Sequence, residues 1–111
     1  MLQLLLLQRV KKSNKGVAYL KQVLKLLKLD LGVSTDKRDE YFNAVLEAAV
    51  LELKRKGISV DLTSADDQML LSDYAAWQYR KRQEDVPISN NLKRRLMNRK
   101  MRNRAGGNAD E

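Results

Sequence analysis

Apolar residues recur every three to four positions along several stretches of the sequence, and this helical period constrains the fold more than any other feature. The clearest stretch is residues 36–56, which follows Ser34-Thr35-Asp36 and ends just before Gly57. Small polar residues favour the start of a helix, and glycine favours its end. The pattern therefore predicts a helix over residues 36–56, with Leu46 and Leu53 in the core.

Three further helices are predicted from the same kind of pattern. One covers about residues 65–83, where Ser64 to Asp67 resembles a capping box and Leu70, Tyr74 and Trp77 are expected in the core. A second runs from Tyr19 to Leu31 and ends at Gly32. A third covers about residues 90–104, after the break at Pro87, and Ser89 or Asn90 is expected to cap it.

These elements predict an all-α fold, a small bundle of four to five helices with a protruding basic C-terminal helix. The single proline and five glycines are too few for a β-sandwich with many turns. Residues 1–16 form an apolar N-terminal extension, 17–86 the helical body, 87–104 the basic helix and 105–111 a flexible tail. The apolar run Leu4 to Leu7 is too short for a membrane span and lacks the flanks of a signal peptide, so a short helix packing on a neighbour is expected.

The composition argues against an enzyme. The chain has no Cys and no His, which removes disulfides, thiolate metal sites and the commonest general base and zinc ligand. Asp66, Asp67 and Asp73 could suggest a magnesium site, but carboxylates are expected at a helix start in any case. No catalytic, metal-binding or cofactor-binding residue is therefore predicted.

The positive charge of the chain is concentrated near one end. The formal net charge is +8, yet residues 1–78 hold 12 basic and 10 acidic side chains. Residues 79–104 hold 10 basic and only 2 acidic ones. A localised basic segment attracts polyanions or acidic protein surfaces. The basic helix is therefore the place where a partner is expected.

We interpret the basic helix as an element that docks on another protein or on a neighbouring subunit. Its apolar stripe is narrow, so the stripe can attach the helix to a surface without covering its charged sides. The residues expected to make this contact are Leu92, Arg94, Arg95, Leu96, Arg99, Met101 and Arg102.

The alternative is a small nucleic-acid-binding, regulatory module. A sequence-specific reader would follow a short turn and carry base-reading side chains on one face. Here Glu84 and Asp85 precede the helix and repel phosphates, and its asparagines are scattered around it. Any contact with DNA is therefore expected to be non-specific.

A distinctive pattern lies in the stretch that begins at Asp67, DQMLLSDYAAWQYRKRQEDVPISNNLKRRLMNRKMR. The pattern consists of D-Y-A-x-W-x-Y-R-x-R, then a proline, then L-x-x-R-L-x-N-R. It resembles the C-terminal half of the small head–tail connector (adaptor, or head-completion) proteins of long-tailed bacteriophages and prophages. The upstream LKLDLGVSTDKRDEYFNAVLEAAVLEL is similar to that family's opening, whereas residues 1–20 depart from it. The matching residues of the pattern are Asp73, Tyr74, Ala75, Trp77, Tyr79, Arg80, Arg82, Pro87, Leu92, Arg95, Leu96, Asn98 and Arg99.

The resemblance implies a structural function in the virion. Connector subunits are small helical domains that form a ring of roughly a dozen copies beneath the portal. The ring extends the DNA channel and presents a surface to the tail or to a stopper protein. The implied partners are further copies of the chain, the portal protein and the tail or stopper protein, with a possible non-specific contact to packaged DNA and none to a membrane. Assembly in the host cytoplasm and a place at the head–tail interface of the virion are implied as well.

Overall fold

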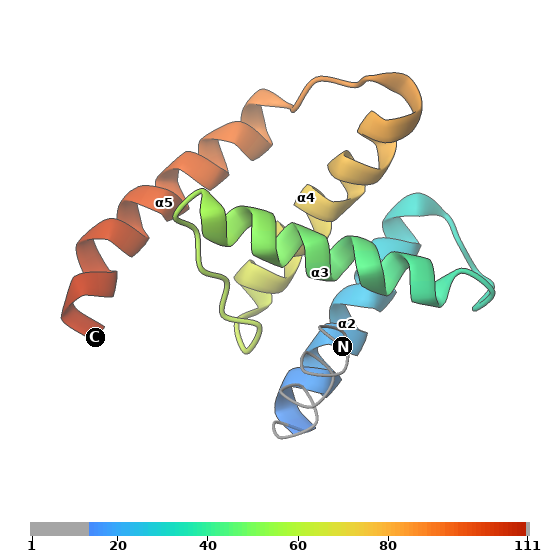
Figure 1. The fold of residues 1–111 in the computed structure, drawn as a ribbon, viewed down its shortest axis with the longest axis horizontal. Helices are drawn as coiled ribbons and strands as arrows, with labels where there is room; N and C mark the ends of the chain where they lie inside the picture. Colours follow the sequence, from blue (N-terminus) through green and yellow to red (C-terminus); the bar gives the residue numbers. More distant parts are fainter. Residues whose placement is uncertain (1–13, 111) are drawn as a thin grey trace.

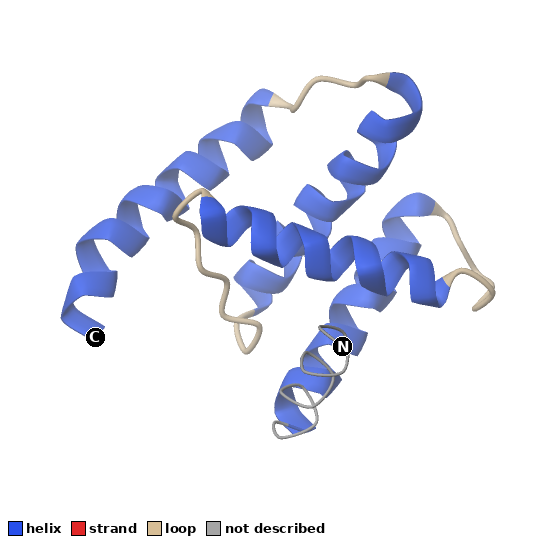
Figure 2. Ribbon diagram, viewed as in Figure 1, coloured by secondary structure: helices blue, strands red, loops and turns tan. Residues whose placement is uncertain are grey.

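The structure, a computed structural model, describes residues 14–110 of the chain. This part is helical throughout and contains no strand (Figure 2). Its four helices are α2 (Asn14–Leu31), α3 (Asp39–Arg55), α4 (Ala65–Glu84) and α5 (Asn90–Asp110). The all-α prediction is confirmed for these residues. The leucine-rich stretch 1–12, predicted as a further helix, lies outside them.

Helix α4 is the centre of the arrangement, because it contacts each of the other three helices. In Figure 1, α3 crosses in front of α4, and α5 lies to one side at the end of the long connection 85–89. Helices α3 and α5 do not contact each other along their described lengths. The outer sides of these two helices therefore belong to separate parts of the surface.

The core lies where α2, α3 and α4 meet, and the first half of α5 adds to it. Leu46, Leu53, Leu70 and Tyr74, which the sequence predicts as core residues, are buried. Trp77 is only half-buried and packs against the edge of this core. The full set of buried apolar residues is Val23, Leu24, Leu27, Phe42, Val45, Leu46, Ala49, Leu53, Ile58, Leu70, Leu71, Tyr74, Ala75, Ala76, Leu92 and Leu96.

The ends of α2 and α3 follow the glycine pattern of the sequence. Gly57 has a φ of +86°, a left-handed conformation that costs a side-chain-bearing residue energy. Its N–H donates to the Lys54 carbonyl, and the Ile58 N–H donates to the Leu53 carbonyl at 2.9 Å. This is the Schellman arrangement, with Ile58 and Leu53 both buried. Gly32 ends α2 in the same way, at a φ of +73°.

The starts of α4 and α5 differ from each other. The Leu92 N–H donates to Ser89 Oγ at 3.1 Å, so Ser89 caps α5 as the sequence predicts. Ser64 precedes α4, but its side chain makes no capping bond. The predicted capping box is therefore wrong. Its other member, Asp67, instead accepts a hydrogen bond from the Asp61 N–H, because its carboxylate is directed toward the preceding loop.

The C-terminal helix is longer than the sequence predicts. Helix α5 extends to Asp110, so residues 105–110 of the predicted flexible tail are helical.

Among the helices of residues 14–110, none combines the length and the hydrophobicity that crossing a bilayer requires.

Candidate functional site

The strongest polar contact between α4 and α5 joins Asp67 to Arg99. The two guanidinium nitrogens Nη1 and Nη2 of Arg99 donate to Oδ1 and Oδ2 of Asp67 at 2.5 and 2.6 Å. The side chains are 17% and 2% exposed, respectively, so this bidentate pair is almost entirely removed from water. Such pairs combine charge with fixed geometry. Arg99 therefore fixes the position of α5 against α4.

A second ion pair joins the same two helices nearer the connection between them. Arg95 Nη1 donates to Asp73 Oδ2 at 2.8 Å, and both side chains are about one-third exposed. The later residue on α4 pairs with the earlier residue on α5, as antiparallel neighbours require. By the helical rise, the acids are about 9 Å apart along α4 and the arginines about 6 Å apart along α5. The long arginine side chains span this difference.

The loop between α3 and α4 is bound by α5 as well. Arg99 Nη2 lies 3.4 Å from the Ser59 carbonyl oxygen, and the Ser59 N–H donates to Asn103 Oδ1 at 3.2 Å. Within the loop, the Thr63 hydroxyl and N–H both donate to Asp61. The Thr63 hydroxyl contributes most to holding the pKa of the Asp61 carboxyl below its usual value. The loop, the start of α4 and the α5 segment 99–103 are thus joined by one polar network.

A shallow cleft of about 280 Å³ lies where α4, the connection 85–89 and α5 meet. Trp77 lines it, and the indole N–H of Trp77 donates to the Val86 carbonyl at 2.9 Å. The two carboxylates of the cleft are each paired with one of its arginines, Asp30 with Arg80 and Asp73 with Arg95. The first pair joins α2 to α4 and the second joins α4 to α5, so both acids make structural contacts.

The side of α5 that points away from the body is basic and partly apolar. Lys93, Arg94, Met97, Met101 and Arg104 are exposed along it, and we call them the outer face of α5. Met97 is 52% and Met101 is 62% exposed. Large exposed apolar side chains flanked by charges are typical of a contact surface for another macromolecule.

The structure divides the predicted docking residues into two groups. Leu92 and Leu96 are buried, and Arg95 and Arg99 are paired with carboxylates of the same chain. These four side chains therefore attach α5 to its own body, which corrects their interpretation as partner-docking residues. Arg94 and Met101 do lie on the outer face of α5, whereas Arg102 is exposed on the side of α5 next to α4, where it lines a pocket with Asp66 and Arg99.

Sequence reasoning missed a second cluster, at the start of α3. The Arg38 guanidinium lies 5.1, 5.2 and 5.6 Å from the ring centres of Tyr41, Phe42 and Tyr79, and it donates to the Tyr79 hydroxyl. Cations are attracted to the faces of aromatic rings. Tyr79 comes from the last third of α4, so only the tertiary fold brings the cluster together. Its arrangement stabilises the packing of α3 on α4.

Among the residues that the structure describes, no group of three or more acidic side chains is placed to hold a metal ion. Comparisons with family models, with curated proteins and with solved structures find no match to this chain.

Proposed function

We propose that this chain is a structural subunit of a phage head–tail connector. In this function it forms a ring of roughly a dozen copies beneath the portal, extends the DNA channel and provides the attachment surface for the tail or stopper protein. Assembly would take place in the host cytoplasm, and the mature location would be the head–tail interface of the virion.

The observation that carries the proposal is how the residues of the connector-like pattern lie in space. Asp73 pairs with Arg95, and Trp77 holds the connection before Pro87 through the Val86 carbonyl. Leu92 and Leu96 are buried in the shared core. The spacing of the pattern therefore has a physical meaning: it specifies how α4, the connection and α5 join as one unit. A chain with this pattern is expected to share the family's architecture.

A second observation supports an assembly function. The outer face of α5 offers two exposed methionines among three basic side chains on a helix fixed to its body by two ion pairs. A fixed contact surface loses little conformational freedom on binding. A subunit that must add repeatedly to the same kind of neighbour benefits from such a surface.

The proposal is tested by measuring the mass of the purified protein, alone and mixed with a candidate portal protein, and by electron microscopy of both samples. The expected result is a ring, or a ring-shaped addition to the portal. A protein that remains monomeric at all concentrations and leaves the portal unchanged would contradict the proposal.

A nucleic-acid-binding module is the second candidate, and the three basic side chains of the outer face of α5 favour it. With three phosphate contacts, the slope of log affinity against log salt concentration would be about −2.7. Binding with that slope and without sequence preference fits a connector near packaged DNA. Preference for one sequence by more than about 1,000-fold would instead favour a regulator.

A further inference from the structure

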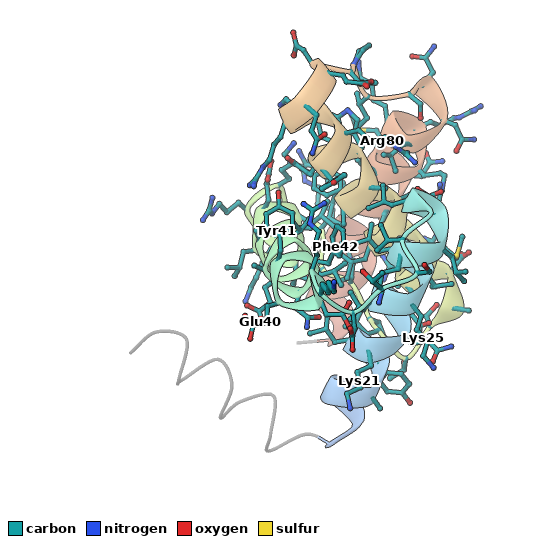
Figure 3. All side chains as sticks on the ribbon, turned by 90° about the vertical axis from the view of Figure 1, so that its right-hand side faces the viewer. Lys21, Lys25, Glu40, Tyr41, Phe42 and Arg80 are labelled. Carbon is teal, nitrogen blue, oxygen red and sulfur yellow. The ribbon has the colours of Figure 1, made fainter. Side chains whose placement is uncertain are left out.

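The chain carries a second exposed helix face whose chemistry complements the outer face of α5. Glu40, Ala44, Glu47, Ala48 and Leu51 lie on the side of α3 that is turned away from the core, and we call them the outer face of α3. Ala44 and Ala48 are exposed, and Leu51 is 45% exposed. Figure 3 looks along α3, with Glu40 on the far side of the helix from the body and Phe42 toward the other helices. This face is acidic and lined by small residues.

The spacings of the two faces match. Met97 and Met101 are four residues apart on α5, and Ala44 and Ala48 are four residues apart on α3. By the helical rise, each pair spans about 6 Å. Small side chains let a second helix approach closely, and large flexible ones fill the space left between the two backbones. The two methionines can therefore pack over the two alanines.

The charges beside these apolar positions are opposite. Glu40 and Glu47 flank the alanines, whereas Lys93, Arg94 and Arg104 flank the methionines. Lys54 and Arg55 reverse the charge at the C-terminal end of α3. A basic helix would therefore cross the middle of α3, over Ala44 and Ala48, and avoid its last turn. Such complementarity favours one partner and disfavours others.

The two faces cannot meet within one molecule. Helices α3 and α5 do not contact each other, and both faces are turned away from the shared core. Because the faces differ, a contact between two copies uses the α5 of one and the α3 of the next. This is a head-to-tail contact, which every added copy can repeat and which closes into a ring when the rotation allows.

We infer that the outer face of α5 of one copy packs on the outer face of α3 of the next, and that this contact joins neighbouring subunits. The inference rests on the proposed ring-forming function and names the surfaces that would build the ring. A single crossing of two helices is a small interface. Each contact is therefore weak, and the closed ring gains stability from the many contacts that it completes at once.

The test exchanges the charges of the two faces. One variant carries Arg94→Glu with Arg104→Glu, and the other carries Glu40→Lys with Glu47→Lys. In a sample of either variant alone, the two faces that meet at every contact carry charges of the same sign, so that variant should fail to form rings. Mixed in equal amounts, the two should form rings again, because each unlike contact then joins opposite charges. One chain carrying all four substitutions should assemble on its own.

A matched control tests whether the position of the exchanged charges matters, rather than the change in net charge alone. Lys21→Glu with Lys25→Glu removes as much positive charge as the α5 variant, from exposed positions of α2 (Figure 3). This control should assemble as the unchanged chain does. Circular dichroism of all variants checks that they remain folded. Light scattering and electron microscopy measure the assembly.

Cysteine cross-linking tests the direction of the contact, since the chain has no Cys of its own. A mixture of Met97→Cys and Ala48→Cys chains should form a disulfide-linked dimer under mild oxidation. Neither variant alone should do so efficiently. Cross-linking of Met97→Cys with itself would show a symmetric α5–α5 contact and overturn the inference.

The remaining outcomes separate this inference from the proposed function. Rings that form equally well in every charge variant would refute the α5–α3 contact and leave the connector function standing. Failure of the two single-face variants, without recovery in the mixture, would also refute it. An unchanged chain that never assembles, alone or with portal, would overturn both.

Discussion

Replacing Arg99 with methionine should lower the free energy of unfolding by about 3–5 kcal/mol, because it leaves the Asp67 carboxylate buried without its cation. The Asp67 side chain is only 2% exposed, so water cannot replace the guanidinium without opening the contact between α4 and α5. Methionine retains much of the apolar length of the arginine side chain. The change therefore acts mainly on the charge and its hydrogen bonds.

The magnitude follows from what Asp67 loses and keeps. It loses two charge-assisted hydrogen bonds from Arg99, each contributing about 1.5–3 kcal/mol. It keeps one bond, from the Asp61 N–H. Losing both bonds amounts to about 3–6 kcal/mol on that scale, which agrees with the cost of breaking a buried ion pair.

Removing the charge of Asp67 as well should restore part of the loss. Asp67→Asn keeps an oxygen that can accept from the Asp61 N–H, and it no longer requires a cation. The double variant Asp67→Asn with Arg99→Met should therefore be more stable than Arg99→Met alone, by about 1–3 kcal/mol.

The measurement is urea denaturation followed by the fluorescence of Trp77, the one tryptophan of the chain. Arg94→Met is the matched control, because Arg94 is an exposed arginine on the outer face of the same helix. It should change the free energy of unfolding by less than about 0.5 kcal/mol. The reasoning is refuted if Arg99→Met costs under about 1 kcal/mol, or if the double variant is no more stable than Arg99→Met.

Three further predictions concern other contacts. Trp77→Phe should cost about 1–2 kcal/mol in urea denaturation followed by circular dichroism, because it removes the donor to the Val86 carbonyl. Gly57→Ala should also cost about 1–2 kcal/mol, since alanine must adopt the φ of +86°, whereas an equally stable variant would show that the turn can relax. Burial raises the pKa of Tyr74 to about 12, above its unfolded value of 10.0, so the folded state holds this proton more tightly. The midpoint of thermal unfolding should fall as pH rises from 10 to 12, and less steeply in Tyr74→Phe.

The helices of the body could be predicted because their signals are local. The apolar stripe of residues 36–56 and its closing Gly57 specify α3 almost without reference to the rest of the chain. The stripe that contains Leu70 and Tyr74 does the same for α4. Trp77 was harder to place, because it lies at the edge of the α4 contacts, where a large side chain can be half-buried.

The attachment of α5 could not be predicted because it depends on pairs that are far apart in sequence. Asp67 at the start of α4 has the ordinary explanation of a helix-start acid, and nothing local distinguishes it from Asp66 beside it. Only the fold shows that Asp67 is directed inward, toward Arg99, while Asp66 is exposed. The one available clue is the antiparallel order of the pairs Asp67–Arg99 and Asp73–Arg95. That clue has meaning only once α4 and α5 are known to be neighbours.

The two sides of α5 explain why a helix so rich in basic residues can belong to the folded body and still offer a surface for a partner. Its inner side uses Arg95 and Arg99 as hydrogen-bond donors to acids of α4, and these charges are neutralised within the chain. Its outer side keeps Lys93, Arg94 and Arg104 in water. Because the inner pairs hold the helix in a fixed orientation, they also determine where the outer charges point. A change on the inner side is therefore expected to lower stability. A change on the outer side is expected to leave the fold intact and, under the proposed contact between copies, to act on assembly.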